Sequence, residues 1–128
     1  MSYYFNKIVD ITFDEAITKV TDELKKEGFG VLTEIDVAAT LKKKINVDFR
    51  QYRILGACNP DFAHKALLAE DKIGTMLPCN IVVQETPDGK IEVAAIDPIA
   101  SMQGVGNQNL GEIASTVQTK LKQVIANI

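Results

Sequence analysis

The hydrophobic positions of the chain change their period several times, and each change marks a new element. Residues 3–11 are rich in aromatic and β-branched side chains, which predicts a strand. In residues 13–24 the apolar positions recur three or four apart, the spacing of one helix face. Thr12 followed three residues later by Glu15 is the capping-box pattern that begins a helix, and Gly28 favours its end. The chain is therefore predicted to open with a strand and an amphipathic helix.

The middle of the chain repeats this alternation with shorter segments. Residues 29–35 predict a second strand, and Asp36 is placed to cap a short helix behind it. Residues 52–57 predict a third strand. The pair Asn59-Pro60 then indicates a helix start, with Asn as the N-cap and Pro at the first helical position.

The last third of the chain predicts a hairpin and a long helix. Residues 73–79 contain Gly and Pro, which indicates an irregular segment or at best an edge strand. Residues 81–96 form two apolar runs around a Pro-Asp-Gly turn, which predicts a β-hairpin. After a glycine-containing stretch at 103–109, expected to be flexible, a regular apolar stripe from residue 109 onward predicts the closing helix.

These elements together predict the fold class. Two consecutive strands joined by a tight turn must be antiparallel, and two long amphipathic helices need a sheet face to cover. We therefore expect a two-layer α+β domain with a mainly antiparallel sheet covered by amphipathic helices. The pattern contains no repeat and no linker, so residues 1–128 are expected to form a single domain.

Composition and charge exclude several classes of protein. A net charge of −3 and the absence of Trp argue against nucleic-acid binding, and the basic run Lys42–Lys44 is best explained as a solvated helix end. No stretch approaches the roughly 18 apolar residues that cross a bilayer, and no secretory signal begins the sequence. We therefore expect a cytoplasmic protein that binds neither membrane nor nucleic acid, with both of its cysteines as free thiols.

Two fragments carry the most distinctive chemistry of the chain. One is Gly56-Ala57-Cys58-Asn59-Pro60 and the other is Leu77-Pro78-Cys79-Asn80. Each places a Cys before an Asn where a predicted strand meets a turn or helix, so Cys58, Asn59, Cys79 and Asn80 are the candidate ligand-binding residues. A thiol at the N-terminus of a helix is favoured as thiolate, and the two cysteines could lie side by side if the third and fourth strands are neighbours.

The same fragments resemble a known family. GACNP and LPCNIVVQE, followed by a Pro-x-Gly turn, a strand and Asp-Pro, are similar to the DUF302 family, and the upstream segment GFGVLTEIDVAATLKKK is similar as well. The resemblance covers essentially the whole chain; one departure is the Met that usually follows the Asp-Pro, which here stands further on, at Met102. It implies the fold known as TT1751-like, a protein of bacteria or archaea, and self-association, most simply as a homodimer. It implies no established activity.

Three functions remain open at this point. The first is a domain that binds a small molecule or a soft metal ion near Cys58 and Cys79, the second is a thiol redox enzyme that uses both, and the third is a structural module whose cysteines are core. A tetrahedral metal site needs four ligands. The only histidine is His64, so metal binding would require a carboxylate such as Asp36 or thiolates pooled from two subunits. No catalytic constellation and no cofactor can be identified from the residues, and no dedicated metal site is predicted within one chain.

Overall fold

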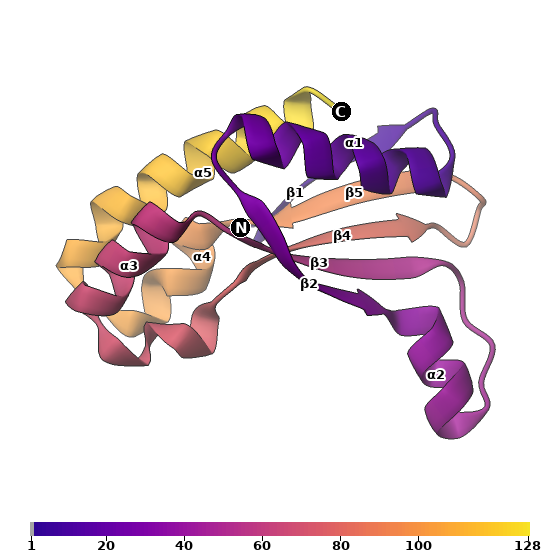
Figure 1. The fold of residues 1–128 in the computed structure, drawn as a ribbon, viewed down its shortest axis with the longest axis horizontal. Helices are drawn as coiled ribbons and strands as arrows, with labels where there is room; N and C mark the ends of the chain where they lie inside the picture. The colour runs from indigo at the N-terminus through magenta and orange to yellow at the C-terminus, as the bar shows by residue number, and fades with distance from the viewer. Residues whose placement is uncertain (1) are drawn as a thin grey trace.

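The computed structural model describes residues 2–128, which form a five-stranded sheet with helices on one side and at one end (Figure 1). The strands and α-helices follow one another along the chain as β1 (Tyr4–Val9), α1 (Phe13–Lys26), β2 (Gly30–Asp36), α2 (Val37–Ile45), β3 (Tyr52–Cys58), α3 (Pro60–Ala69), β4 (Cys79–Glu85), β5 (Ile91–Ile96), α4 (Pro98–Met102) and α5 (Gly111–Ala126). Short 3₁₀ turns at Asp71–Met76, Gln103–Val105 and Gln108–Leu110 connect them.

The sheet has the strand order β1-β5-β4-β3-β2, and every neighbouring pair is antiparallel. The predicted hairpin is the pair β4–β5, and β3 is the other neighbour of β4. The predicted α+β class is therefore confirmed, and the strands and helices lie close to the predicted positions. The segment 73–79 is mostly a 3₁₀ turn, and only its last residue, Cys79, belongs to a strand.

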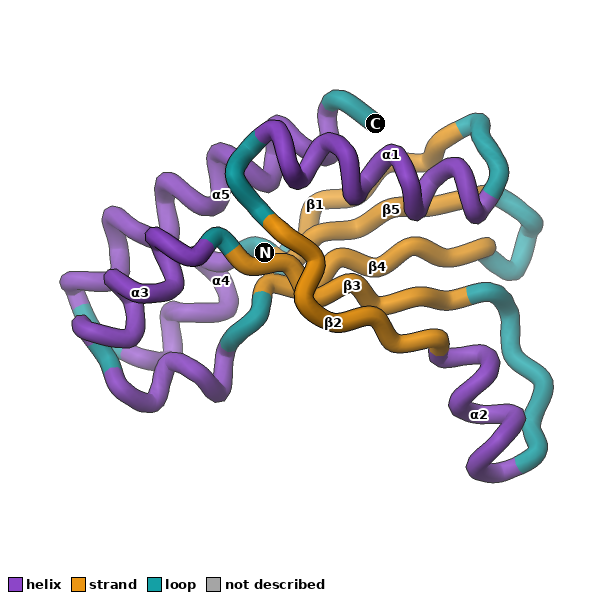
Figure 2. Tube along the Cα trace, in the orientation of Figure 1, coloured by secondary structure: helices purple, strands orange, loops and turns teal. Residues whose placement is uncertain are grey.

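The two long helices cover the same face of the sheet. Figures 1 and 2 show α1 and α5 lying across one side of the strands, while α3 and α4 gather at one end. Leu24 of α1 and Leu121 of α5 are fully buried against inward-facing strand residues such as Leu55, Ile81 and Val93. This helix-covered face is the hydrophobic core of the domain.

Local signals account for the helix boundaries. The Thr12 side chain accepts from the backbone N–H of Glu15, and the Glu15 carboxylate accepts from the backbone N–H of Thr12, so the predicted capping box is confirmed. The bond from the Thr12 backbone N–H, and to a smaller extent the Thr12 hydroxyl, lower the pKa of Glu15, since both favour the charged carboxylate. Asp36 caps α2 through the backbone N–H of Ala39, as the sequence predicted.

The opposite face of the sheet, which we name the open face, has no helix lying across it (Figure 2). In a half-covered antiparallel sheet the outward positions are normally polar. Here many are apolar or aromatic, and by the strand register they are Tyr4, Ile8, Ile35, Tyr52, Ile54, Val82, Ala94 and Ile96. Within residues 2–128, no helix is both long enough and apolar enough to cross a membrane.

Candidate functional site

The register of the sheet brings the two cysteines to the same end of neighbouring strands. Cys79, the first residue of β4, is paired with Ala57 of β3, so Cys58 stands one residue further along β3. Cys58 is partly exposed, whereas Cys79 is buried with 9% of its surface accessible. The third and fourth strands are thus neighbours, which was the condition for the two cysteines to lie near each other, and both thiols are free.

A pocket of about 240 Å³ opens beside these thiols, and we name it the cysteine pocket. It lies where the ends of β3 and β4 meet α3 and α5, and none of its lining side chains is charged. Phe29, Phe62 and Val117 provide apolar wall, and Asn59 is the one carboxamide among the lining residues. Pockets that are mainly apolar with a few convergent polar groups are typical of small-molecule sites.

Burial keeps the Cys79 thiol protonated. Desolvation is the larger cause and the nearby Cys58 the smaller, and together they raise the pKa of Cys79 to about 11. A thiol with this pKa is almost entirely uncharged near neutral pH, and the thiolate is the form that attacks or binds metal. The Cys79 side chain is therefore an uncharged, polarisable part of the pocket lining and a weak hydrogen-bond donor.

Asn59 stands at the N-cap position of α3, but its side chain does not cap the helix. Its amide Nδ2 instead donates a long bond of 3.5 Å to the Glu27 carbonyl at the end of α1. Gly28 makes room for this contact, because a Cβ there would lie 3.0 Å from Asn59 Nδ2, and its φ of +84° also favours glycine. The predicted N-cap position of Asn59 is confirmed, but its side chain makes no capping bond, since a tertiary contact holds the amide beside the pocket.

Asn80 is separated from the other three candidate residues. Successive strand residues point to opposite faces, so Cys79 faces the core while Asn80 faces the open side, where it lines a different pocket. Asn80 is the second residue of β4, so the strand itself fixes its orientation. The structure brings together Cys58, Asn59 and Cys79 at the pocket, without Asn80.

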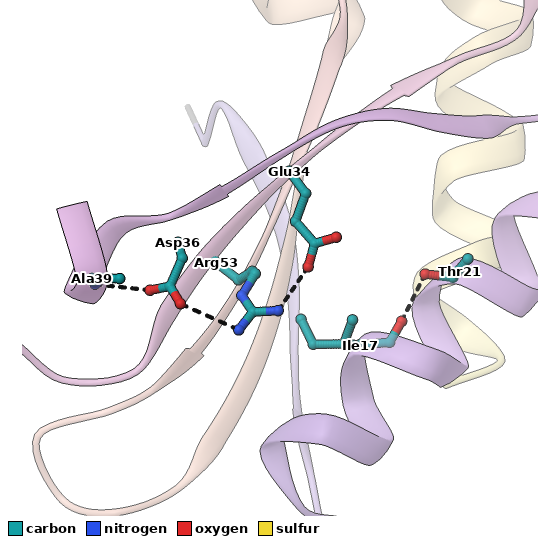
Figure 3. Close-up of polar contacts among 6 residues, drawn as sticks. All are labelled: Ile17, Thr21, Glu34, Asp36, Ala39 and Arg53. Atoms are coloured by element: carbon teal, nitrogen blue, oxygen red, sulfur yellow. Dashed lines mark hydrogen bonds and ion pairs between the residues drawn. The ribbon is translucent and has the colours of Figure 1, made fainter.

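Asp36 is also excluded as a metal ligand beside the cysteines of the same chain. Gly30 at the start of β2 is paired with Cys58, whereas Asp36 ends the strand about 20 Å away, at the usual rise per residue. Figure 3 shows that the Asp36 carboxylate there accepts hydrogen bonds from the Ala39 backbone N–H and from Arg53. Arg53 also binds Glu34 at 2.7 Å. In the part of the chain that the structure describes, no three His, Cys, Asp or Glu residues form a group that could hold a metal ion.

A second hollow adjoins the cysteine pocket and shares Met102 and Ala114 with it. This second hollow measures about 330 Å³, and uncharged amides such as Gln103 and Gln108 stand at its edge. The segment that forms it is tied to α3, because Asn107 donates 2.8 Å and 3.3 Å bonds to Ala69 O and Glu70 Oε1. Sequence reasoning did not identify Met102 or the α5 residues as site residues, since they look like ordinary core positions of amphipathic helices.

The fold and the site define a two-layer α+β domain with a thiol-lined apolar pocket at one end of an antiparallel sheet. The family model described as "Domain of unknown function DUF302" matches residues 5–128, so the chain belongs to the DUF302 family. The crystal structure of an uncharacterised conserved DUF302 protein from Bacillus stearothermophilus is similar, with a TM-score of 0.92 and 28% sequence identity. That similarity covers 99% of this chain and 98% of the other. No match was found among the curated proteins.

Proposed function

We propose that the protein binds a small, uncharged and mainly apolar molecule in the cysteine pocket. The observation that carries the proposal is the pocket itself, an open cavity in a 128-residue domain whose lining includes two free thiols and one carboxamide. A charged ligand group would lose its hydration there without gaining an opposite charge. The lining therefore favours a neutral ligand.

The adjoining hollow suggests the shape of this ligand. A pocket of about 240 Å³ is below the usual size of small-molecule sites, which begin at about 300 Å³. Because a second hollow shares Met102 and Ala114 with this pocket, we propose a ligand with an apolar body and a neutral polar end that reaches both. The apolar body would lie against Phe62 and Cys79, and the polar end would meet the amides near Gln103.

Binding of a neutral fluorescent probe tests this proposal directly. N-phenyl-1-naphthylamine should bind the wild type with an increase in fluorescence, because the ring system leaves water for an apolar wall. Ala63→Phe, which places a ring in the pocket from α3, should weaken probe binding at least tenfold. Ala126→Phe, an exposed position at the end of α5, is the matched control and should bind like the wild type. Equal affinity of the wild type and Ala63→Phe, or no binding by the wild type, would contradict the proposal.

A thiol redox pair is the second candidate, since Cys58 and Cys79 occupy neighbouring strand ends. In this reaction the two thiols give two protons and two electrons to a disulfide oxidant such as oxidised glutathione, so that one protein disulfide forms and two glutathione thiols are released. Intact mass after treatment tests it, because an internal disulfide lowers the mass by about 2 Da, whereas a mixed disulfide with glutathione raises it. The raised pKa of Cys79 predicts slow oxidation. If neither probe binding nor a disulfide is found, the third function, a structural module with core cysteines, is favoured.

A further inference from the structure

The open face of the sheet carries more apolar side chains than a surface in contact with water usually does. Its middle row across the five strands reads Ile35, Ile54, Val82, Ala94 and Asn6, four apolar residues out of five. Ile35 leaves 47% of its surface exposed. A contiguous apolar patch on the surface of a small domain marks an interaction site more often than chance.

The aromatic residues point to the same face. The chain has three tyrosines, and Tyr3, Tyr4 and Tyr52 all line one shallow groove of about 340 Å³ on this surface. Tyr3 and Tyr4 stack edge to face with their rings 5.0 Å apart and remain 65% and 41% exposed. Tyrosine is enriched at protein interfaces, where it supplies contact area together with a hydrogen-bonding hydroxyl.

We propose that this face is the interface of a symmetric homodimer whose two-fold axis runs parallel to β4, between the two sheets. Because β4 has two strands on either side, this axis places β3 of one copy over β5 of its partner. Residue sizes then complement each other at the centre of the face, since Ile54 lies over the partner's Ala94. Two-fold homodimers are the commonest soluble oligomers, and packed sheets lie about 10 Å apart.

Polar groups on the face fit the same arrangement. Glu92 accepts from Asn6 at 2.9 Å and from Gln84 at 2.8 Å, and Gln84 accepts from Arg50 at 2.9 Å. Arg50 and Glu92 lie on opposite sides of β4, so the proposed axis brings Arg50 of one copy toward the partner's Glu92. On each side of the axis this arrangement therefore places one positive side chain near one negative side chain.

The size of the surface matches that of a stable dimer. Five strands about 4.8 Å apart, with about six residues each, present roughly 500 Å² in projection, and their side chains make the accessible area larger. α2 projects from the end of β2 away from α1 (Figure 1), contains no buried residue and leaves Ile45 62% exposed. A nine-residue helix is marginal without packing, and a partner under this arm supplies it. The open face and α2 together approach the roughly 800 Å² that each partner buries in a standard interface.

An exchange of residue sizes tests this arrangement. The wild type should be a dimer by native mass spectrometry and light scattering at micromolar concentration. Ile54→Ala and Ala94→Ile should each raise the dimer dissociation constant about tenfold, because one leaves a gap and the other a clash. The double variant Ile54→Ala/Ala94→Ile should return to within about threefold of the wild type. These two positions are separated by Val82 within one sheet, so the recovery arises across the interface.

Charge at the centre of the face provides the second measurement. Val82→Lys should give a folded monomer, since two lysines would meet at the axis. Leu68→Lys, which replaces an equally apolar but 75% exposed residue on α3, should remain dimeric. A wild type that is monomeric at 100 µM, a dimeric Val82→Lys, or a double variant as weak as the two single changes combined would overturn the proposal. A monomeric Leu68→Lys would place the interface on α3 and overturn it as well.

Discussion

The buried Cys79 thiol gives a quantitative prediction about stability at alkaline pH. Its pKa is about 11 in the folded chain and 9.0 in an unperturbed thiol, so the unfolded chain ionises first as the pH rises. The folded state binds the proton more tightly, and stability from this group is present below pH 9 and lost between pH 9 and 11. One pKa unit corresponds to about 1.4 kcal/mol, so the loss reaches about 1 kcal/mol at pH 10 and about 2 kcal/mol at pH 11.

Urea unfolding of the reduced wild type and of Cys79→Ala, measured from pH 8 to pH 11, checks this value. Groups that ionise far from Cys79 are common to both proteins and cancel in the difference. The variant should be less stable at pH 8, because alanine leaves a small void among Ala57, Ile81 and the other core residues. The two stability curves should then approach each other by about 2 kcal/mol as the pH rises to 11. Curves that stay parallel would refute the desolvation of Cys79.

Three further predictions concern the fold. Gly56→Ala should lower the free energy of unfolding by about 1–3 kcal/mol, because a Cβ there would collide with Thr33 Oγ1 and lie 2.7 Å from Pro78 Cγ. Adding Thr33→Ala should recover part of this loss. Chemical denaturation measures the free energy of unfolding of both variants. Leu121→Ala should cost about 2–5 kcal/mol in the same assay, since this side chain is fully buried between helix and sheet, and a change below 1 kcal/mol would contradict its place in the core. Thr12→Ala should cost about 1 kcal/mol through the lost capping bond, whereas Thr12→Ser should be nearly neutral, and equal losses in the two variants would argue against capping.

Many of the helix and strand boundaries could be predicted because each depends on residues close together in the sequence. The capping box at Thr12, the Asp36 cap and the apolar stripe that includes Leu121 each depend on residues a few positions apart. The same reasoning failed at Asn59, where a local cap competes with a bond to Glu27 O that is 32 residues away in sequence. Only the folded chain decides between these two partners.

The pocket could be predicted only in part for the same reason. The repeated Cys-Asn pair indicated a shared neighbourhood for Cys58 and Cys79, and the β3–β4 register supplies it. The sequence could not show that strand alternation sends Asn80 to the other face, nor that β2 carries Asp36 to the far end of the sheet. Contacts from Phe29 and Val117 depend on how α1 and α5 cross the strands, which no spacing along the chain specifies.

The proposed ligand site and the proposed dimer interface lie in different parts of the sheet, so it can be tested whether they act independently. Val82 belongs to the open face and does not line the cysteine pocket, although Cys79 stands three residues before it in β4. A monomeric Val82→Lys variant should therefore bind N-phenyl-1-naphthylamine within about twofold of the wild-type affinity. Pro78 connects the two faces, because it lines the pocket and packs against Gly56. A tenfold change in probe affinity on loss of the dimer would show that this contact couples association to binding, because two sites influence each other only when they bias a shared element.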